Sequence, residues 1–87
     1  MNERELLDRI KRLVAELCEL DAAEIADDGR LLGYGVDSVR ALDLFFAFED
    51  EFGLEIDEQD PELAGVKSVR DLGDLVARRL AIGRAAD

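Results

Sequence analysis

The sequence has no histidine and a single cysteine, Cys18, among its 87 residues. Without histidine or a cysteine cluster, its side chains offer neither a zinc site nor histidine-based acid–base catalysis, so we expect no metal ligands and no catalytic residues. One cysteine cannot form an internal disulfide, which favours a reducing compartment, and we expect the cytoplasm. Cys18 lies beside the apolar stripe of the first predicted helix, which predicts a small core residue and no reactive thiol.

Positive charge is scarce as well: 22 acidic residues outnumber 11 basic ones, for a formal net charge of −11. This balance repels nucleic-acid phosphates and anionic lipid surfaces, so we expect no partner of either class. No apolar run reaches membrane-spanning length, and the charged N-terminus does not resemble a signal peptide. Basic surfaces on other proteins are the natural complement, although the same charge also fits a role in solubility alone.

The length of the chain limits its architecture. A chain of 87 residues that is 48% hydrophobic can close one core and not two. We expect a single monomeric domain over residues 1–87, with its core over about 3–82 and a frayed tail over 83–87. A catalytic pocket with its own supporting side chains is hard to build at this size, which favours a binding or carrying role.

Apolar residues repeat at three- and four-residue steps, and this pattern predicts an all-α fold without a sheet. We expect a four-helix bundle of three main helices and one short helix. The first helix follows Asn2, a capping residue, with Glu5 three positions later. The second is expected over 38–52, between Asp37 as its N-cap and Gly53 after its end.

The short third helix is expected to begin at Asp60-Pro61 and to stop at Gly65. The fourth helix is expected to start after Ser68, with Asp71 completing a capping box. Five apolar residues form its predicted buried side: Val69, Leu72, Leu75, Val76 and Leu80.

A long loop, roughly 20–37, separates the first two predicted helices and is rich in glycine and aspartate. We expect Leu31, Leu32 and Val36 to pin this loop to the core, and residues 21–24 to form one short helical turn. A loop of this length in so small a domain is usually functional or has its own anchors.

The second predicted helix has two apolar sides on a wheel of 3.6 residues per turn. The core side holds five residues: Ala41, Leu44, Phe45, Phe48 and Phe52. Val39 and Phe46 lie nearly opposite, beside carboxylates, with Leu42 on the flank. Because an inert surface would be polar, we interpret this outward side as a docking surface. The alternatives are that another segment covers Phe46, or that single exposed apolar residues have no role.

Ser38 stands at the start of this helix, after a glycine-bearing loop. Free backbone N–H groups and the positive end of the helix dipole favour an anion there, so the hydroxyl suits a phosphate-linked arm. Catalysis by Ser38 itself is excluded in the serine–histidine manner, because no histidine is present. The alternative is that Asp37 is only an N-cap and Ser38 only a first-turn residue, a common pair at helix starts.

An ordered set of motifs spans nearly the whole chain. Gly-Val-Asp-Ser-Val at 35–39 opens the second helix, Phe-Glu-Asp-Glu-Phe-Gly-Leu-Glu-Ile at 48–56 ends it, and Ser-Val-Arg-Asp-Leu at 68–72 opens the last helix. The sequence therefore resembles the acyl carrier protein family, whose signature is a Gly-x-Asp-Ser-Leu attachment site opening a helix that ends in acids and phenylalanine.

The resemblance implies that Ser38 receives 4′-phosphopantetheine from coenzyme A through a magnesium-using phosphopantetheinyl transferase, with Asp37 and Val39 as the flanking motif. The thiol of that arm holds acyl, aminoacyl or peptidyl cargo as a thioester, so the protein is a carrier and not an enzyme. The implied partners are loading, condensing and transferring enzymes with basic docking surfaces. The docking residues lie on the second helix: Val39, Arg40, Asp43, Phe46, Glu49 and Asp50.

Three positions depart from the family pattern. Val39 replaces the commoner leucine, and Arg40 stands where members from primary metabolism usually have an acid. Tyr34 lies between two glycines just before the motif, where it contacts the arm or simply packs. These departures favour a specialised polyketide, nonribosomal peptide or aminoacyl pathway over housekeeping fatty-acid synthesis.

Two alternatives belong to other classes of protein. The first is an unmodified acidic helical domain that binds a basic partner, in which Ser38 stays bare. The second is a calcium site in the acid-rich segment 57–62, which is disfavoured because its spacing does not fit the EF-hand loop and the turn glycine is missing.

Overall fold

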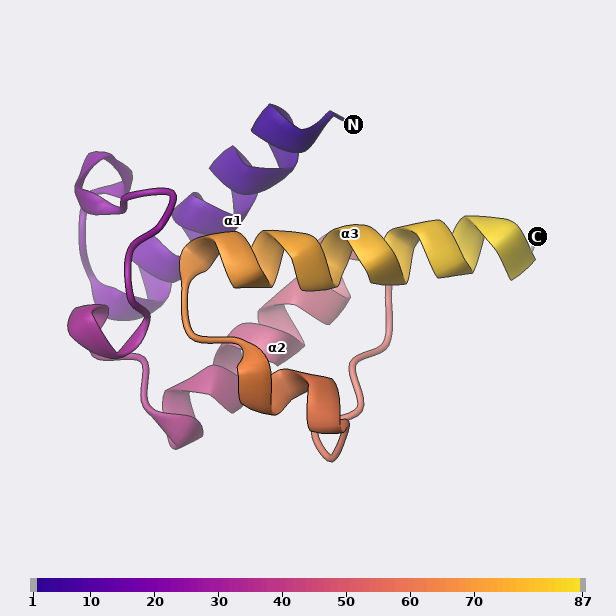
Figure 1. The fold of residues 1–87 in the computed structure, drawn as a ribbon. Coiled ribbons are helices and arrows are strands. Elements are labelled where there is room, and N and C mark those ends of the chain that lie inside the picture. The colour runs from indigo at the N-terminus through magenta and orange to yellow at the C-terminus, as the bar shows by residue number, and fades with distance from the viewer. Residues whose placement is uncertain (1, 87) are drawn as a thin grey trace.

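Three α-helices form the framework of the protein. The computed structural model describes the backbone of residues 2–86 and the side-chain surroundings of residues 2–81. The helices are α1 (Glu3–Cys18), α2 (Ser38–Phe52) and α3 (Val69–Ala86), and three short 3₁₀ helices lie between them: η1 (Ala22–Glu24), η2 (Leu32–Tyr34) and η3 (Pro61–Gly65). In Figure 1, α3 lies in front of α1 and α2, and its C-terminal end projects beyond them.

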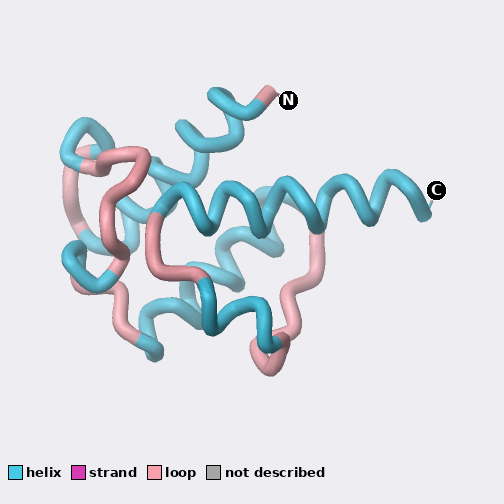
Figure 2. Tube along the Cα trace, in the orientation of Figure 1, coloured by secondary structure: helices cyan, strands magenta, loops and turns pink. Residues whose placement is uncertain are grey.

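The predicted all-α bundle with three main helices and one short helix is confirmed, the short helix being η3. Figure 2 shows that the loops gather in two stretches, one before α2 and one on either side of η3. The turn predicted at 21–24 is present as η1, whereas η2 was not predicted. The first loop therefore contains two local turns and is not one irregular stretch.

The predicted caps explain where α1 and α3 begin. Asn2 accepts a hydrogen bond from the Glu5 N–H at 2.8 Å and donates one to the Glu5 carboxylate at 3.2 Å. At α3, the Ser68 hydroxyl accepts from the Asp71 N–H, and the Asp71 carboxylate accepts from the Ser68 N–H, both at 3.1 Å. The first pair gives an acceptor to the Glu5 N–H and the second to the N–H groups of both Ser68 and Asp71, which a helix start otherwise leaves without one.

The core lies where the apolar stripes of the three helices meet. Phe48 is its largest fully buried side chain, and its ring packs edge-on against Phe52 with 6.0 Å between centroids. Burying one such side chain stabilises the fold by about 1.5–3 kcal/mol. Cys18 packs, half-buried, against this core, as predicted. Among residues 2–81, eight large side chains are less than 2% exposed: Phe48, Ile10, Leu44, Leu72, Leu75, Val14, Val69 and Val76.

Two details of the prediction are wrong. Leu32 does not pin the loop: its side chain is 74% exposed, because Leu31 and Leu32 follow each other in a tight turn and only Leu31 points inward. The tail expected over 83–87 is helical as far as Ala86, because α3 continues past Gly83. One glycine inside a helix costs about 1 kcal/mol relative to alanine, which is too little to end it among good helix formers.

A backbone clasp joins the loop before α2 to the start of α3. The Leu31 N–H donates to the Lys67 carbonyl and the Val69 N–H donates to the Gly29 carbonyl, both at 3.0 Å. These bonds make an isolated antiparallel bridge between Arg30 and Ser68. Two loops 38 residues apart, counted from Arg30 to Ser68, are thereby held side by side at one end of the bundle.

The carboxylate of Asp27 ties the same loop to α1. Arg4 donates two hydrogen bonds to it, at 3.0 and 3.1 Å, and Lys11 forms an ion pair with it. Arg70 of α3 lies 4.0 Å away. The hydrogen bond from Arg4, followed by that from Lys11, holds the pKa of Asp27 well below its usual value.

This lowered pKa makes a pH-dependent contribution to stability. An aspartate in an unfolded chain has a pKa of about 3.9, so the contribution is complete above about pH 4 and is lost as the pH falls through the lower folded value. We predict that Asp27→Asn lowers the melting temperature at neutral pH and that the gap to the parent protein closes below about pH 4. Thermal unfolding across that range is the measurement.

Asp43→Asn is the matched control, because Asp43 is exposed and has no ion pair within residues 2–81. It should leave the melting temperature at neutral pH nearly unchanged. If the difference in melting temperature between Asp27→Asn and the parent protein is the same at every pH, the ion pairs of Asp27 do not stabilise the fold as described.

Candidate functional site

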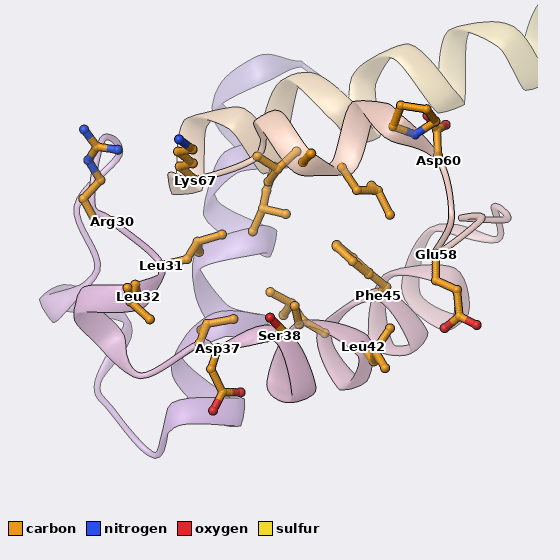
Figure 3. Close-up of a pocket in the computed structure, with 18 of the residues that line it drawn as sticks. Arg30, Leu31, Leu32, Asp37, Ser38, Leu42, Phe45, Glu58, Asp60 and Lys67 are labelled. Atoms are coloured by element: carbon orange, nitrogen blue, oxygen red, sulfur yellow. The ribbon is translucent and has the colours of Figure 1, made fainter.

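Ser38 is the first residue of α2, and its side chain is exposed. Asp37 caps the helix as predicted: its carboxylate accepts the Arg40 N–H, and its carbonyl accepts the Ala41 N–H, both at 2.9 Å. The N–H groups of Ser38 and Val39 lie in the first turn, where a helix offers them no acceptor. Figure 3 shows the Ser38 hydroxyl at the edge of a pocket, with the Asp37 carboxylate pointing away from it.

The chain enters α2 from a fixed position. Gly35 has a φ of 93°, a left-handed conformation that glycine adopts without a steric penalty. Val36 follows, is 6% exposed, and donates its N–H to the Leu31 carbonyl at 3.0 Å. Ser38 is thus held two residues from a buried anchor while its own side chain stays accessible.

Tyr34 packs within the loop, which answers the question left open by the sequence. Its hydroxyl accepts the Ala26 N–H at 2.9 Å, and its ring covers Gly29. A Cβ atom at Gly29 would fall 2.6 Å from the ring carbon Cε2, closer than two carbons can approach. The Tyr34 ring therefore packs directly on Gly29 and joins two parts of the loop. We call this contact the Tyr34–Gly29 lock.

We predict that Gly29→Ala destabilises the protein by about 1–3 kcal/mol, because the added methyl group must displace the ring. Combining it with Tyr34→Ala should cost less than the sum of the two single changes, because the clash partner is then absent. Urea unfolding of the single and double variants measures this coupling.

Gly33→Ala is the control, because the nearest atom to a Cβ there is 3.9 Å away and its φ is not left-handed. It should cost much less than Gly29→Ala. If the loss of stability in the double variant equals the sum of the two single losses, Gly29 and Tyr34 do not interact and the Tyr34–Gly29 lock is ruled out.

Arg40 and Glu49, two of the predicted docking residues, have partners inside the protein. The Arg40 guanidinium donates to the Leu17 carbonyl at 3.1 Å, in the last turn of α1, which has no basic residue of its own. A cation at a helix C-terminus is worth about 0.3–1 kcal/mol. The half-buried Glu49 accepts the Ile56 N–H at 3.2 Å. Both side chains hold α2 in place against its neighbours.

The outward side of α2 is apolar around Ser38. Val39 is 72% exposed and Phe46 62% exposed, as the helical wheel predicted, so no segment of residues 2–81 covers Phe46. Leu42 is partly exposed on the flank. The exposed Leu32 lines the pocket together with Ser38 and Leu42, so we count it with this surface. Sequence reasoning missed it because nothing in the local pattern separates it from Leu31.

We define the α2 face as this apolar surface with its two acids, Asp43 and Asp50. Both acids are exposed, and neither has an ion pair in the described part of the chain. The α2 face therefore combines apolar contact area near Ser38 with negative charge along the rest of the helix. Its members are Leu32, Val39, Leu42, Asp43, Phe46 and Asp50.

A pocket of about 1280 Å³ opens between α2, η3 and the loop before α2. Ser38 and Asp37 line one edge of it, and Figure 3 shows Leu42 and Phe45 on the α2 side. Its inner wall is hydrocarbon, supplied by residues that include Leu31, Val36, Leu44, Phe45, Leu63 and Leu72. An apolar chain that starts near Ser38 has space to enter.

The acid-rich segment 57–62 pairs with α3. Asp60 and Glu62 form ion pairs with Arg79 and Arg78. The Glu62 N–H, followed by Arg79, lowers the pKa of Asp60. Over residues 2–81, no group of three or more histidine, cysteine, aspartate or glutamate side chains is arranged to hold a metal ion. None of the described helices is long and apolar enough to cross a membrane.

Comparison with known proteins identifies the family. The sequence profile described as "Phosphopantetheine attachment site" matches residues 8–76. The acyl carrier protein of Saccharopolyspora erythraea is 31% identical over 100% of this chain and 94% of its own length. That of Thermosynechococcus vestitus is 29% identical over 93% of this chain and 99% of its own length.

Solved structures agree with the sequence comparison. The crystal structure of the Thermotoga maritima acyl carrier protein superposes with a TM-score of 0.75 at 30% identity, covering 93% of both chains. The HMG-ACPI domain of the CurA module from Lyngbya majuscula shares the fold, with a TM-score of 0.77 at 19% identity, over 94% of this chain and 82% of that one. This chain belongs to the acyl carrier protein family, which holds 4′-phosphopantetheine covalently.

Proposed function

We propose that Ser38 is the residue on which this carrier protein holds its 4′-phosphopantetheine. The observation that supports this best is its placement: an exposed hydroxyl on the first residue of a helix, beside an apolar pocket. The other serine of the chain, Ser68, is used as a helix cap and accepts the Asp71 N–H. Ser38 is therefore the serine whose hydroxyl is available for a phosphodiester.

The residues around Ser38 can bind the phosphodiester but cannot activate the hydroxyl. The N–H groups at the start of α2 and the helix dipole stabilise its negative charge. Asp37 is already bonded to the Arg40 N–H, and the chain has no histidine, so the base that removes the serine proton belongs to the transferase. When bound, the arm supplies a terminal thiol that holds the cargo as a thioester.

The α2 face and the pocket have different roles in this proposal. The pocket receives the apolar part of the cargo, while the α2 face docks the phosphopantetheinyl transferase and the enzymes that load or consume the cargo. Val39, Phe46 and Leu32 supply the contact area, and Asp43 and Asp50 attract basic partner surfaces. Arg40 and Glu49, with their internal bonds, position α2 for this docking.

The two serines allow a matched test of the attachment residue. Ser38→Ala should abolish labelling by a fluorescent coenzyme A derivative and a phosphopantetheinyl transferase, with unchanged circular dichroism. Ser68→Ala should keep full labelling and lose about 0.5–2 kcal/mol of stability, the usual cost of removing a helix cap. Labelling that persists in Ser38→Ala would move the site elsewhere.

The docking role is tested at Phe46, which is 62% exposed. Phe46→Ala should raise the KM of the transferase for this protein about tenfold, as expected when an interface residue worth about 1–2 kcal/mol is truncated. Its melting temperature should change little, because an exposed ring adds little to the core. Leu20→Ala, at an exposed position outside the α2 face, is the control. A large loss of stability with a normal KM would place Phe46 in the fold and not in docking.

The pathway stays a prediction. Arg40 and Tyr34 favoured a specialised pathway, and both have partners inside this protein, so neither distinguishes it from fatty-acid synthesis. The absence of catalysis, the monomeric state and the cytoplasmic location also stay predictions. An unmodified interaction domain would share the α2 face, and the labelling of Ser38 separates that alternative from a carrier.

A further inference from the structure

One segment beside the pocket has no buried side chain to hold it in place. We call residues 57–65, which include η3, the strap. None of its side chains is buried, and only Asp60 and Leu63 are half-buried. Ile56 and Val66, which flank the strap, pack half-buried against the core. The strap is therefore anchored in the core at its two ends and not between them.

Hydrogen bonds fix the same two ends. The Ile56 N–H donates to the Glu49 carboxylate of α2 at 3.2 Å. After the strap, the Lys67 N–H donates to the Asp71 carboxylate of α3 at 3.0 Å. The strap thus spans from α2 to α3 between two fixed points.

Ion pairs with α3 attach the middle of the strap. The backbone hydrogen bond from the Leu63 N–H to the Asp60 carbonyl, at 3.0 Å, is local and reaches no other element. Arg79 pairs with Asp60, and both side chains are 23% exposed. Arg78 pairs with Glu62, which also lies 3.7 Å from Arg79. Two neighbouring arginines of α3 therefore hold the part of the strap that the core does not.

The strap forms one wall of the pocket beside Ser38. Three of its apolar residues line the pocket that Ser38 also lines: Pro61, Leu63 and Ala64. In Figure 1 the strap, in orange, lies in front of α2 and below α3. Figure 3 shows Asp60 on the α3 side of the pocket and Leu42 on the α2 side. A movement of the strap away from α3 would open this wall.

We propose that Arg78 and Arg79 are a latch that keeps the strap closed over the pocket and thereby sets how long an apolar acyl cargo stays inside. The inference rests on the proposed function, because the cargo enters from an arm on Ser38. Hydrophobic burial alone does not hold the strap, since none of its side chains is buried. Partly exposed ion pairs are weak, which suits a wall that must open to release its cargo.

The test follows the access of a small reagent to the cargo thioester. A transferase loads the arm from octanoyl-coenzyme A or acetyl-coenzyme A, and hydroxylamine, an uncharged nucleophile, then cleaves the thioester while the intact mass is recorded. The octanoyl chain draws its thioester into the pocket, whereas the acetyl group has almost no hydrocarbon to bury. Methionine keeps the apolar stem of arginine without its charge. Arg79→Met should therefore speed octanoyl cleavage about threefold to fivefold, the size of one or two exposed ion pairs, and leave acetyl cleavage unchanged.

Arg9→Met is the matched control. Arg9 forms an ion pair with Glu51 at 3.8 Å, and neither residue lines the pocket beside Ser38. Both cleavage rates should stay as in the parent protein. Added salt should speed octanoyl cleavage in the parent protein more than in Arg79→Met, because the variant has already lost the screened ion pairs.

Charge reversal tests the second ion pair independently. Glu62→Arg and Arg78→Glu each place like charges together, so each should speed octanoyl cleavage. The double variant restores opposite charges and should return the rate toward that of the parent protein.

Three results overturn the latch while the proposed function stands: unchanged or slower octanoyl cleavage in Arg79→Met, the same acceleration in Arg9→Met, or a double variant no slower than either single variant. Failure to load either cargo on Ser38 overturns both.

Discussion

The structure depends on the fastening of the first loop to α3. Two backbone hydrogen bonds of 3.0 Å join Leu31 to Lys67 and Val69 to Gly29, and Leu31 and Val36 are buried beside them. Loops in small domains are usually mobile because few of their contacts are buried. In this protein the loop is held by three sets of contacts: the backbone clasp to α3, the ion pairs of Asp27 and the Tyr34–Gly29 lock. Together they compensate for the small core and determine where the chain enters α2.

Because the chain enters α2 at a fixed position, Ser38 can meet two requirements at once. Its hydroxyl must be accessible to an enzyme, yet its position relative to the pocket and to the α2 face must be constant. The buried Val36 and the Asp37 cap hold the backbone, while Ser38 itself is exposed on the first turn of α2. Arg40 adds a bond between α2 and the C-terminal turn of α1, so a second helix contributes to the same positioning.

Local sequence signals predict most of the framework. Asn2, Asp37 and Ser68 are capping residues whose hydrogen bonds form within three positions, so the starts of the helices can be deduced from short stretches. The exposure of Val39 and Phe46 follows from helical periodicity alone.

The remaining features depend on contacts between distant segments. The covering of Gly29 by Tyr34 and the bond from Arg40 to Leu17 exist only once the loop has folded back. The same holds for the outward turn of Leu32 and the backbone bridge between Arg30 and Ser68. A one-dimensional pattern does not encode such distances, so these parts of the site could be found only in three dimensions.

The central claim, that Ser38 bears the arm of a carrier protein, is tested most directly by mass spectrometry of the intact chain. The protein is incubated with coenzyme A, magnesium and a broad-specificity phosphopantetheinyl transferase, and the modified chain is fragmented to locate the added mass. The account predicts a gain of one phosphopantetheine, located at Ser38. No gain on a chain that starts unmodified, or a gain located at another residue, would contradict it.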